Sequence, residues 1–141
     1  MFPPIYLSLL KFDSKQQRLI CDAGLEKGFN YNSSYQGLTK TNSKPPGFWD
    51  QGHIRVKVGK GRETFEAGKS LLKKWGQFQL GWAEVDSGTP VQVESPVCVV
   101  AKTLFFWTAN PLKVMWKNQS LPVCSWVLAW SLISRGGALL T

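Results

Sequence analysis

Residues 58–75, VGKGRETFEAGKSLLKKW, combine glycine, lysine and serine in the manner of a phosphate-binding loop. A Walker loop needs a further glycine upstream of its Gly-Lys-Ser tripeptide, so that consecutive backbone N–H groups wrap the phosphate. The sequence has Glu63 at that position, and a carboxylate repels the anion. Gly68 also follows Phe65 and precedes Leu72 at helical spacing, which leaves no backbone donor free. The tripeptide therefore predicts part of a helix and no nucleotide site.

Lys60, Gly61 and Arg62 form a second candidate for anion binding, at the start of the same helix. Exposed N–H groups at a helix N-terminus attract phosphate or carboxylate groups, and two cations would assist them. Glu63 and Glu66, however, complement the positive end of the helix dipole from within the chain. Two interpretations stay open: an anion site, or a tight glycine turn in which Arg62 pairs with Glu66.

Metal-binding and catalytic patterns are scarce in this sequence. Cys21, Cys98 and Cys124 are widely separated and never form Cys-x-x-Cys, so with His53 they predict free thiols and no metal site. His53 has no nucleophile pattern beside it, and a catalytic base needs one. We therefore assign no catalytic residue and no cofactor. Free thiols favour a reducing, cytoplasmic location.

The formal net charge is +8 at pH 7, and the sequence pI is about 9.6. Such a charge suits nucleic acid or an anionic membrane surface as a partner. Lys69, Lys73 and Lys74 form a basic rim toward the end of the predicted helix. The aromatic residues that would stack on bases, Trp75 and Phe78, lie on apolar stripes instead. Nucleic acid is therefore an alternative partner and not the favoured one.

Hydrophobic periodicity predicts an α+β fold with a mostly antiparallel sheet packed with helices. Helical spacing indicates one helix over residues 14–23, ended by Gly24 and Gly28, and a second over 62–75 whose apolar stripe faces the core. Alternating apolar residues indicate a half-buried strand at 53–59 and a second strand at 77–85, and the sequence DSGTP at 86–90 indicates a turn. The predicted strands are residues 53–59, 77–85, 91–93, 97–101 and 112–116.

The stretches FNYNSSYQGLT and GFWDQGHIRVKVGKGRETFEAGKSLLKKWGQFQLGWAEVDSGTPVQVESPVCVVAK resemble the uncharacterised family called domain of unknown function 1990, or uncharacterised protein family 0548. The resemblance covers residues 29–115 and implies no catalytic residue. Family members are similar to START and Bet v 1 helix-grip folds, in which a curved antiparallel sheet and a C-terminal helix enclose an apolar cavity. The matching positions are Asn30, Tyr31, Gly37, Thr39, Gly47, Gly59, Gly61, Phe65, Leu71, Trp75, Phe78 and Trp82.

Seven tryptophans in 141 residues indicate either an aromatic core or an apolar cavity. The helix-grip resemblance implies the cavity. Such a cavity would bind a hydrophobic small molecule, with burial of the ligand's apolar surface driving the affinity. The candidate lining residues are Phe65, Leu71, Trp75, Phe78 and Trp82.

The resemblance ends near Met115, and residues 116–141 form a divergent apolar tail without acidic residues. Family members continue there with further strands and a closing helix. We hypothesise that the tail is an out-of-frame or alternatively spliced end, which would make residues 1–115 a partial family domain and this form truncated and non-functional. A membrane segment is the alternative. The apolar run at 121–133 is shorter than the ~20 residues of a spanning helix and contains Pro122, so we predict no transmembrane span.

Overall fold

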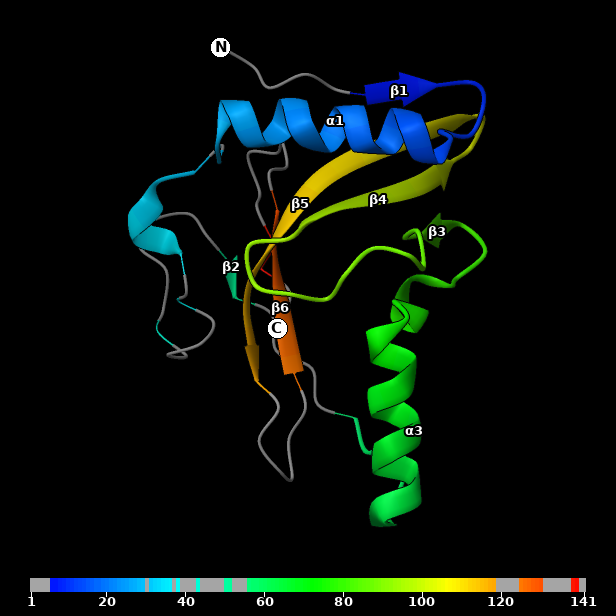
Figure 1. The fold of residues 1–141 in the computed structure, drawn as a ribbon, viewed down its shortest axis with the longest axis vertical. Helices are drawn as coiled ribbons and strands as arrows, with labels where there is room; N and C mark the ends of the chain where they lie inside the picture. The colour runs from blue at the N-terminus through cyan, green and yellow to red at the C-terminus, as the bar shows by residue number, and fades with distance from the viewer. Residues whose placement is uncertain are drawn as a thin grey trace.

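The computed structural model describes residues 6–29, 31–36, 38, 43, 50–51, 56–118, 125–130 and 138–139, with side chains except at 50–51, 118, 125–130 and 138–139. It confirms the predicted α+β class (Figure 1). The helices are α1 (Ser14–Lys27) and α3 (Gly61–Lys73), with short 3-10 helices η1 (Ser33–Tyr35) and η2 (Gly76–Phe78). The strands are β1 (Tyr6–Ser8), β2 (Asp50–Gln51), β3 (Ala83–Glu84), β4 (Pro96–Thr103), β5 (Phe106–Asn118), β6 (Ser125–Trp130) and β7 (Ala138–Leu139).

The main sheet has the order β1-β5-β4-β3, and β6 also pairs with β5. Its pairings are antiparallel, as predicted, whereas β2 and β7 form a separate parallel pair. β1 pairs with residues 107–109 of β5, and β6 pairs with residues 112–118 along the same edge. β6 and β7 fall within residues 116–141, and the division of the chain at residue 115 stays a prediction.

Pro111 lies inside β5, where a proline would normally interrupt the ladder of hydrogen bonds. Val114 accepts a hydrogen bond from the Glu94 N–H (2.8 Å) and donates one to the Ser95 carbonyl (3.1 Å), on the side that leads into β4. Because the bonding direction alternates along an antiparallel strand, the backbone of Pro111 faces the opposite edge. There it falls between the β1 and β6 pairings, so the missing N–H costs no ladder bond.

β4 is buried on both faces of the sheet, because Val97, Cys98, Val99 and Val100 are each at most 5% exposed. Alternate residues of a strand point to opposite faces, so two core clusters result. The cluster on the α1 side contains Phe12, Ile20, Cys21, Cys98, Val100 and Ala109. The cluster on the other face contains Trp75, Val85, Val97, Val99, Leu112 and Val114. The sheet therefore lies between two other layers: α1 on one face, and on the other face the segment that contains Trp75 and Val85.

α1 begins with a capping box: Gln16 N–H donates to Asp13 Oδ1 (2.8 Å), and Asp13 N–H donates to Gln16 Oε1 (2.9 Å). Gly28, with φ +71°, ends the helix, whereas Gly24 lies inside it and does not end it as predicted. At Gly24 the helix approaches the sheet so closely that an added Cβ would lie 2.9 Å from Pro111 Cβ. The missing side chain of Gly24 therefore sets the distance between helix and sheet.

We expect Gly24→Ala to lower the free energy of unfolding by about 1 kcal/mol, although alanine favours a helix by about that amount. The added methyl group meets the rigid ring of Pro111, and overpacking of this kind costs about 1–3 kcal/mol. Gly68→Ala in α3 is the matched control, because a Cβ there meets no atom within 4 Å and should stabilise the chain. Urea denaturation of both variants measures whether each change lowers or raises the free energy of unfolding. Stabilisation by Gly24→Ala would refute the close packing.

The apolar stripe predicted for α3 does not enter the core. α3 forms at the predicted place but has no buried residue, and Figure 1 shows it extending away from the main sheet. Trp75, which follows the helix in a left-handed conformation (φ 57°), enters the core instead. Glu66 Oε2 lies 3.9 Å from Lys69 Nζ. Among the ion pairs of the described residues, Glu66 does not form the predicted pair with Arg62.

The alternating pattern at 77–85 is not a strand over its length. Phe78 ends η2, Gly81 has a φ of +79°, and only Ala83–Glu84 pair with β4. The physical reason is that Phe78 packs against the Trp75 cluster from a 3-10 turn, while Leu80 is 51% exposed. An apolar alternation can thus arise from separate contacts without a pleated strand.

Two further strand predictions also differ from the structure. Residues 53–55 lie outside the described residues, and 56–59 have no regular structure, with Val56 and Val58 exposed. Residues 91–93 form no strand either. The strands predicted at 97–101 and 112–116 are confirmed as parts of β4 and β5.

Candidate functional site

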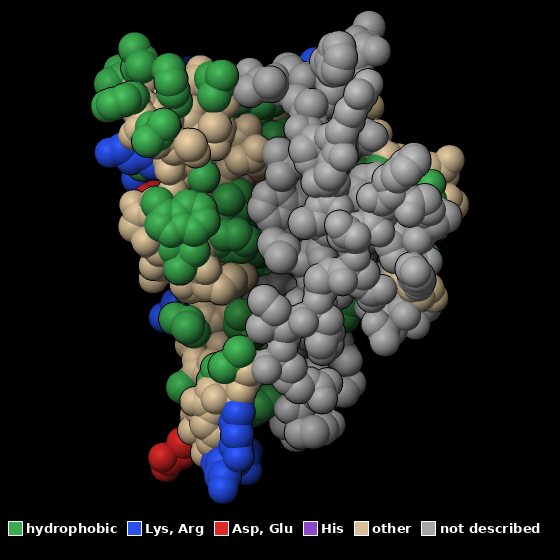
Figure 2. Space-filling view, turned by 180° about the vertical axis from the view of Figure 1, so that it is seen from behind, with side chains coloured by type: hydrophobic (Ala, Val, Ile, Leu, Met, Phe, Trp, Pro, Cys, Tyr) green, Lys and Arg blue, Asp and Glu red, His purple; other side chains and the backbone are tan. Residues whose placement is uncertain are grey.

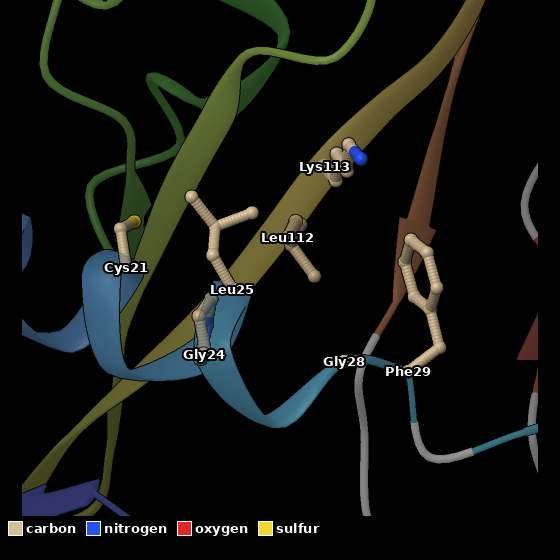
Figure 3. A pocket seen from close by; sticks show the side chains of 8 residues that line it. Cys21, Gly24, Leu25, Gly28, Phe29, Leu112 and Lys113 are labelled. Carbon is tan, nitrogen blue, oxygen red and sulfur yellow. The ribbon is translucent and has the colours of Figure 1, made fainter.

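A pocket opens between the C-terminal half of α1 and β5 (Figure 3). We call it the α1–β5 pocket. Its volume is about 100 Å³, and it is partly open to solvent. Its apolar walls come from Leu25, Phe29 and Pro111, and β5 also lines it at Leu112, whose side chain belongs to the cluster on the other face of the sheet.

The local sequence of α1 explains why this pocket exists. Gly24 and Gly28 line the pocket without side chains. At Gly24 the helix approaches Pro111 closely, whereas an added Cβ at Gly28 would meet no atom within 4 Å. The positive φ of Gly28 turns the chain at the end of α1, and Figure 3 shows the Phe29 ring across from Leu25 and Leu112. The pocket therefore opens beside the close contact at Gly24, toward the turn at Gly28.

The cation at the pocket, Lys113, already has partners. Its Nζ forms an ion pair with the Glu94 carboxylate and lies 6.0 Å from the centroid of the Phe29 ring. The Phe29 ring in turn lies 5.1 Å from the Tyr31 ring, centroid to centroid. Lys113 therefore helps to position Phe29, and its charge is balanced within the protein.

Burial raises the pKa of Tyr31 to about 12, from an ordinary value of 10.0. The folded chain therefore holds this proton more tightly than the unfolded chain does. Its contribution to stability is complete below about pH 10 and is lost as the pH rises through about 12. We expect the wild type to lose stability across this window relative to Tyr31→Phe, measured by urea unfolding at each pH. Equal losses in both proteins would exclude Tyr31 as the cause.

A second pocket, of about 260 Å³, lies between α1, the turn at 86–90 and the start of β4. Charged side chains of α1 and of the turn contribute to its lining. Polar groups of the turn serve the fold: Asp86 Oδ1 accepts a hydrogen bond from Gly88 N–H (2.9 Å), and the Thr89 carbonyl accepts one from Trp75 Nε1 (2.8 Å). This pocket is larger but is partly built from groups with structural partners.

Cys21 and Cys98 are free, buried thiols. Cys21 lines both pockets, and Cys98 lines the second. The hydrogen bond that Cys98 shares with Cys21, together with burial, raises the pKa of the Cys98 thiol. A thiol that keeps its proton is a poor nucleophile and a poor metal ligand. No group of three or more His, Cys, Asp or Glu side chains in the described part of the chain is arranged to hold a metal.

The five residues predicted to line a ligand cavity have different environments. Trp75 is fully buried, and the Phe78 ring packs 6.2 Å from it, centroid to centroid. Leu71 and Trp82 are 55% and 57% exposed, and Phe65 is partly exposed. Neither pocket is lined by any of the five. Their role in ligand binding stays a prediction.

The residues of the predicted anion site lie at the start of α3. Lys60, Gly61 and Arg62 are exposed, and Gly61 has a φ of +88°, which a glycine adopts without strain. Glu63 occupies the first turn of α3, where it complements the helix dipole. The glycine turn is therefore present, and anion binding at it stays a prediction.

Two observations bear on the predicted partners. The rings that the basic rim would need for stacking on bases are engaged, because Trp75 is buried and Phe78 packs against it. Within the described ranges, the helices are too short or too polar to cross a membrane.

Periodicity alone misses Leu25, Phe29 and Pro111 as site residues. The available signal is Gly24 at the end of the predicted helix, because a glycine in such a pattern can also have a packing reason. It does not specify which strand approaches the helix. The packing of α1 against β5 is a tertiary contact between parts of the chain that are distant in sequence.

Comparison with known proteins gives a family match and two curated relatives. The model described as Domain of unknown function (DUF1990) matches residues 34–129. A UPF0548 protein of Arabidopsis thaliana is 36% identical over 115 residues, which cover 75% of this chain and 54% of the relative. A UPF0548 protein of Dictyostelium discoideum is 30% identical over 60 residues, which cover 42% of this chain and 28% of the relative. The chain thus spans about half, or less, of the length of these relatives, and no solved structure matches it.

Proposed function

Because this chain belongs to the DUF1990 family, whose description names no activity, we propose its function from the α1–β5 pocket: the chain binds a small hydrophobic molecule there. One observation carries the proposal. An apolar pocket opens between α1 and β5 beside the turn at Gly28, which has no side chain to fill it. Burial of the ligand's apolar surface supplies the affinity.

The volume of the α1–β5 pocket limits the ligand. Pockets for drug-sized molecules have volumes of roughly 300–1,000 Å³, and an apolar cavity of about 150 Å³ accommodates benzene. A volume of about 100 Å³ is smaller than either, but the pocket is partly open. It therefore suits one ring or a short branched alkyl group, and the rest of a longer ligand would project into solvent.

The charges around the α1–β5 pocket favour a neutral ligand. The Lys113 ammonium is balanced by the Glu94 carboxylate, so an anionic ligand would have to displace a partner that is already in place. Leu25, Phe29 and Pro111 contribute no side-chain hydrogen-bond donors, and the Cys21 thiol, which also lines the pocket, shares its hydrogen bond with Cys98. Shape and apolar contact therefore determine which ligand fits.

Ligand-observed NMR with benzene, cyclohexane and indole as neutral probes and benzoate as an anionic probe tests this proposal. We expect a neutral probe to receive saturation from the protein, with binding that added salt does not weaken, because apolar burial is not screened. Leu25→Glu should weaken this binding about tenfold, or about 1.4 kcal/mol, because it places a carboxylate in the apolar wall. Leu25 is 47% exposed, so the fold should tolerate the change.

Val93→Glu is the matched control, since Val93 is an exposed valine (49%) outside the α1–β5 pocket. Probe binding that survives Leu25→Glu unchanged would contradict the proposed site. Loss of binding in Leu71→Glu or Trp82→Ala, with no loss in Leu25→Glu, would assign the ligand to the cavity predicted from the sequence. Oligonucleotide binding that weakens steeply with salt would favour the nucleic-acid alternative instead.

A further inference from the structure

An exposed group of large apolar side chains lies at one end of the main sheet. It combines the turn between β4 and β5 with the residues that follow β1, and the two are neighbours because β1 pairs with the beginning of β5. These side chains are between 47% and 82% exposed. We call this group the apolar tip; it consists of Leu9, Leu10, Leu104, Phe105 and Phe106.

The apolar tip is convex. In Figure 1 the end of β1 and the β4–β5 turn lie together at the upper right. In Figure 2, seen from behind, hydrophobic side chains gather at the corresponding upper left corner, with Lys and Arg side chains just below them. Small-molecule sites are concave, so a projecting apolar corner does not form one. Its shape suits insertion between the molecules of a lipid layer.

Directly behind the apolar tip, Trp107 lies between two lysines. Lys11 Nζ and Lys102 Nζ are 5.8 Å and 5.9 Å from the centroid of its ring. Glu84 pairs with Lys11 at 2.7 Å, and Trp82, 57% exposed, accepts a hydrogen bond from the Lys102 N–H at 2.6 Å. Tryptophan and lysine favour the headgroup region of a bilayer, because each has an apolar body and a polar end.

The backbone of the turn provides an independent observation. Thr103 pairs with Phe106, which leaves Leu104 and Phe105 as a two-residue loop. Leu104 has a φ of +53°, in the left-handed region where a leucine is strained and where hairpin turns prefer glycine or asparagine. The chain thus places an apolar side chain at an exposed position where it destabilises the hairpin. Residues held in such sparsely populated conformations cluster at functional sites.

We propose that the apolar tip inserts into the surface of an anionic lipid bilayer, with Lys102, which has no carboxylate partner among the ion pairs of the described residues, contacting lipid phosphates. A bilayer accepts leucine and phenylalanine side chains without hydrogen-bonding partners, and the net charge of +8 attracts the chain to anionic lipid. The proposal uses residues outside the α1–β5 pocket, so it stands independently of the proposed ligand.

Co-sedimentation with unilamellar vesicles tests the proposal. The vesicles contain either phosphatidylcholine alone or phosphatidylcholine and phosphatidylserine at about three to one, so that only the second kind carries surface charge. We expect the wild type to bind the anionic vesicles, more weakly as salt rises. The double variant Leu104→Gly, Phe105→Ser should bind them at least about tenfold more weakly. Its thermal midpoint should be unchanged or higher, because glycine relieves the strain at position 104.

Val93→Ser, an exposed valine in the segment before β4, is the control and should bind as the wild type does. Failure of the wild type to sediment with either kind of vesicle would overturn the proposal, as would undiminished binding by a folded double variant. Sedimentation velocity adds a further outcome. If the wild type is an oligomer that the double variant converts to monomer, and neither binds vesicles, the apolar tip contacts a second copy of the chain and not a bilayer.

Discussion

Trp75→Ala should remove about 3–5 kcal/mol from the free energy of unfolding, a large part of the stability of a typical domain. Trp75 is 0% exposed and contacts the core cluster on the sheet face opposite α1. Its indole Nε1 also donates a hydrogen bond to the Thr89 carbonyl at 2.8 Å. The substitution therefore leaves both a cavity and an unpaired carbonyl. Urea denaturation followed by circular dichroism measures the loss.

Two further variants separate the causes of this effect. Trp75→Phe keeps an aromatic ring but removes the N–H donor, so it should cost less, about 1–3 kcal/mol. Trp82→Ala is the matched control, because Trp82 is 57% exposed and exposed substitutions usually change stability by about 0.5 kcal/mol or less. If Trp82→Ala were as destabilising as Trp75→Ala, the assignment of Trp75 as the core tryptophan would be wrong.

Val99→Ala and Val100→Ala should each destabilise the chain by about 2 kcal/mol, from lost apolar burial and the cavity that remains. The two residues are neighbours on β4 but belong to clusters on opposite faces of the sheet. In a sheet with one solvated face, only one of two such neighbours would matter. Val93→Ala, at an exposed position, is the control. A neutral result for either Val99 or Val100 would contradict the three-layer arrangement.

The elements that could be predicted from sequence are those whose pattern has one physical cause. α1 has helical spacing and a glycine at its end, and β4 is a run of β-branched residues that suits burial on both faces. α3 lies where the sequence predicts a helix, because its apolar residues keep helical spacing over a long stretch. The sequence does not predict the environment of α3, because a stripe of apolar residues indicates an amphipathic helix without showing what covers it.

The candidate site was less predictable than the fold. The sequence gives no reason to expect different burial of Trp75 and Trp82, yet Trp75 is fully buried and Trp82 is more than half exposed. The difference depends on the left-handed backbone at Trp75, which turns its side chain toward the sheet after the helix ends. The α1–β5 pocket depends on Gly24 meeting Pro111 across a long sequence separation. Neither event leaves a periodic signal.

The most direct test of the central claim, that the α1–β5 pocket binds a small hydrophobic molecule, is a measurement of intermolecular nuclear Overhauser effects between a neutral probe such as benzene and the leucine methyl groups of the full chain. The Leu25 side chain lines the pocket, whereas Leu71 and Leu80 are exposed leucines outside it. We predict contacts from the probe to the methyl groups of Leu25. Contacts confined to Leu71 and Leu80, or spread evenly over exposed leucines, would contradict the account.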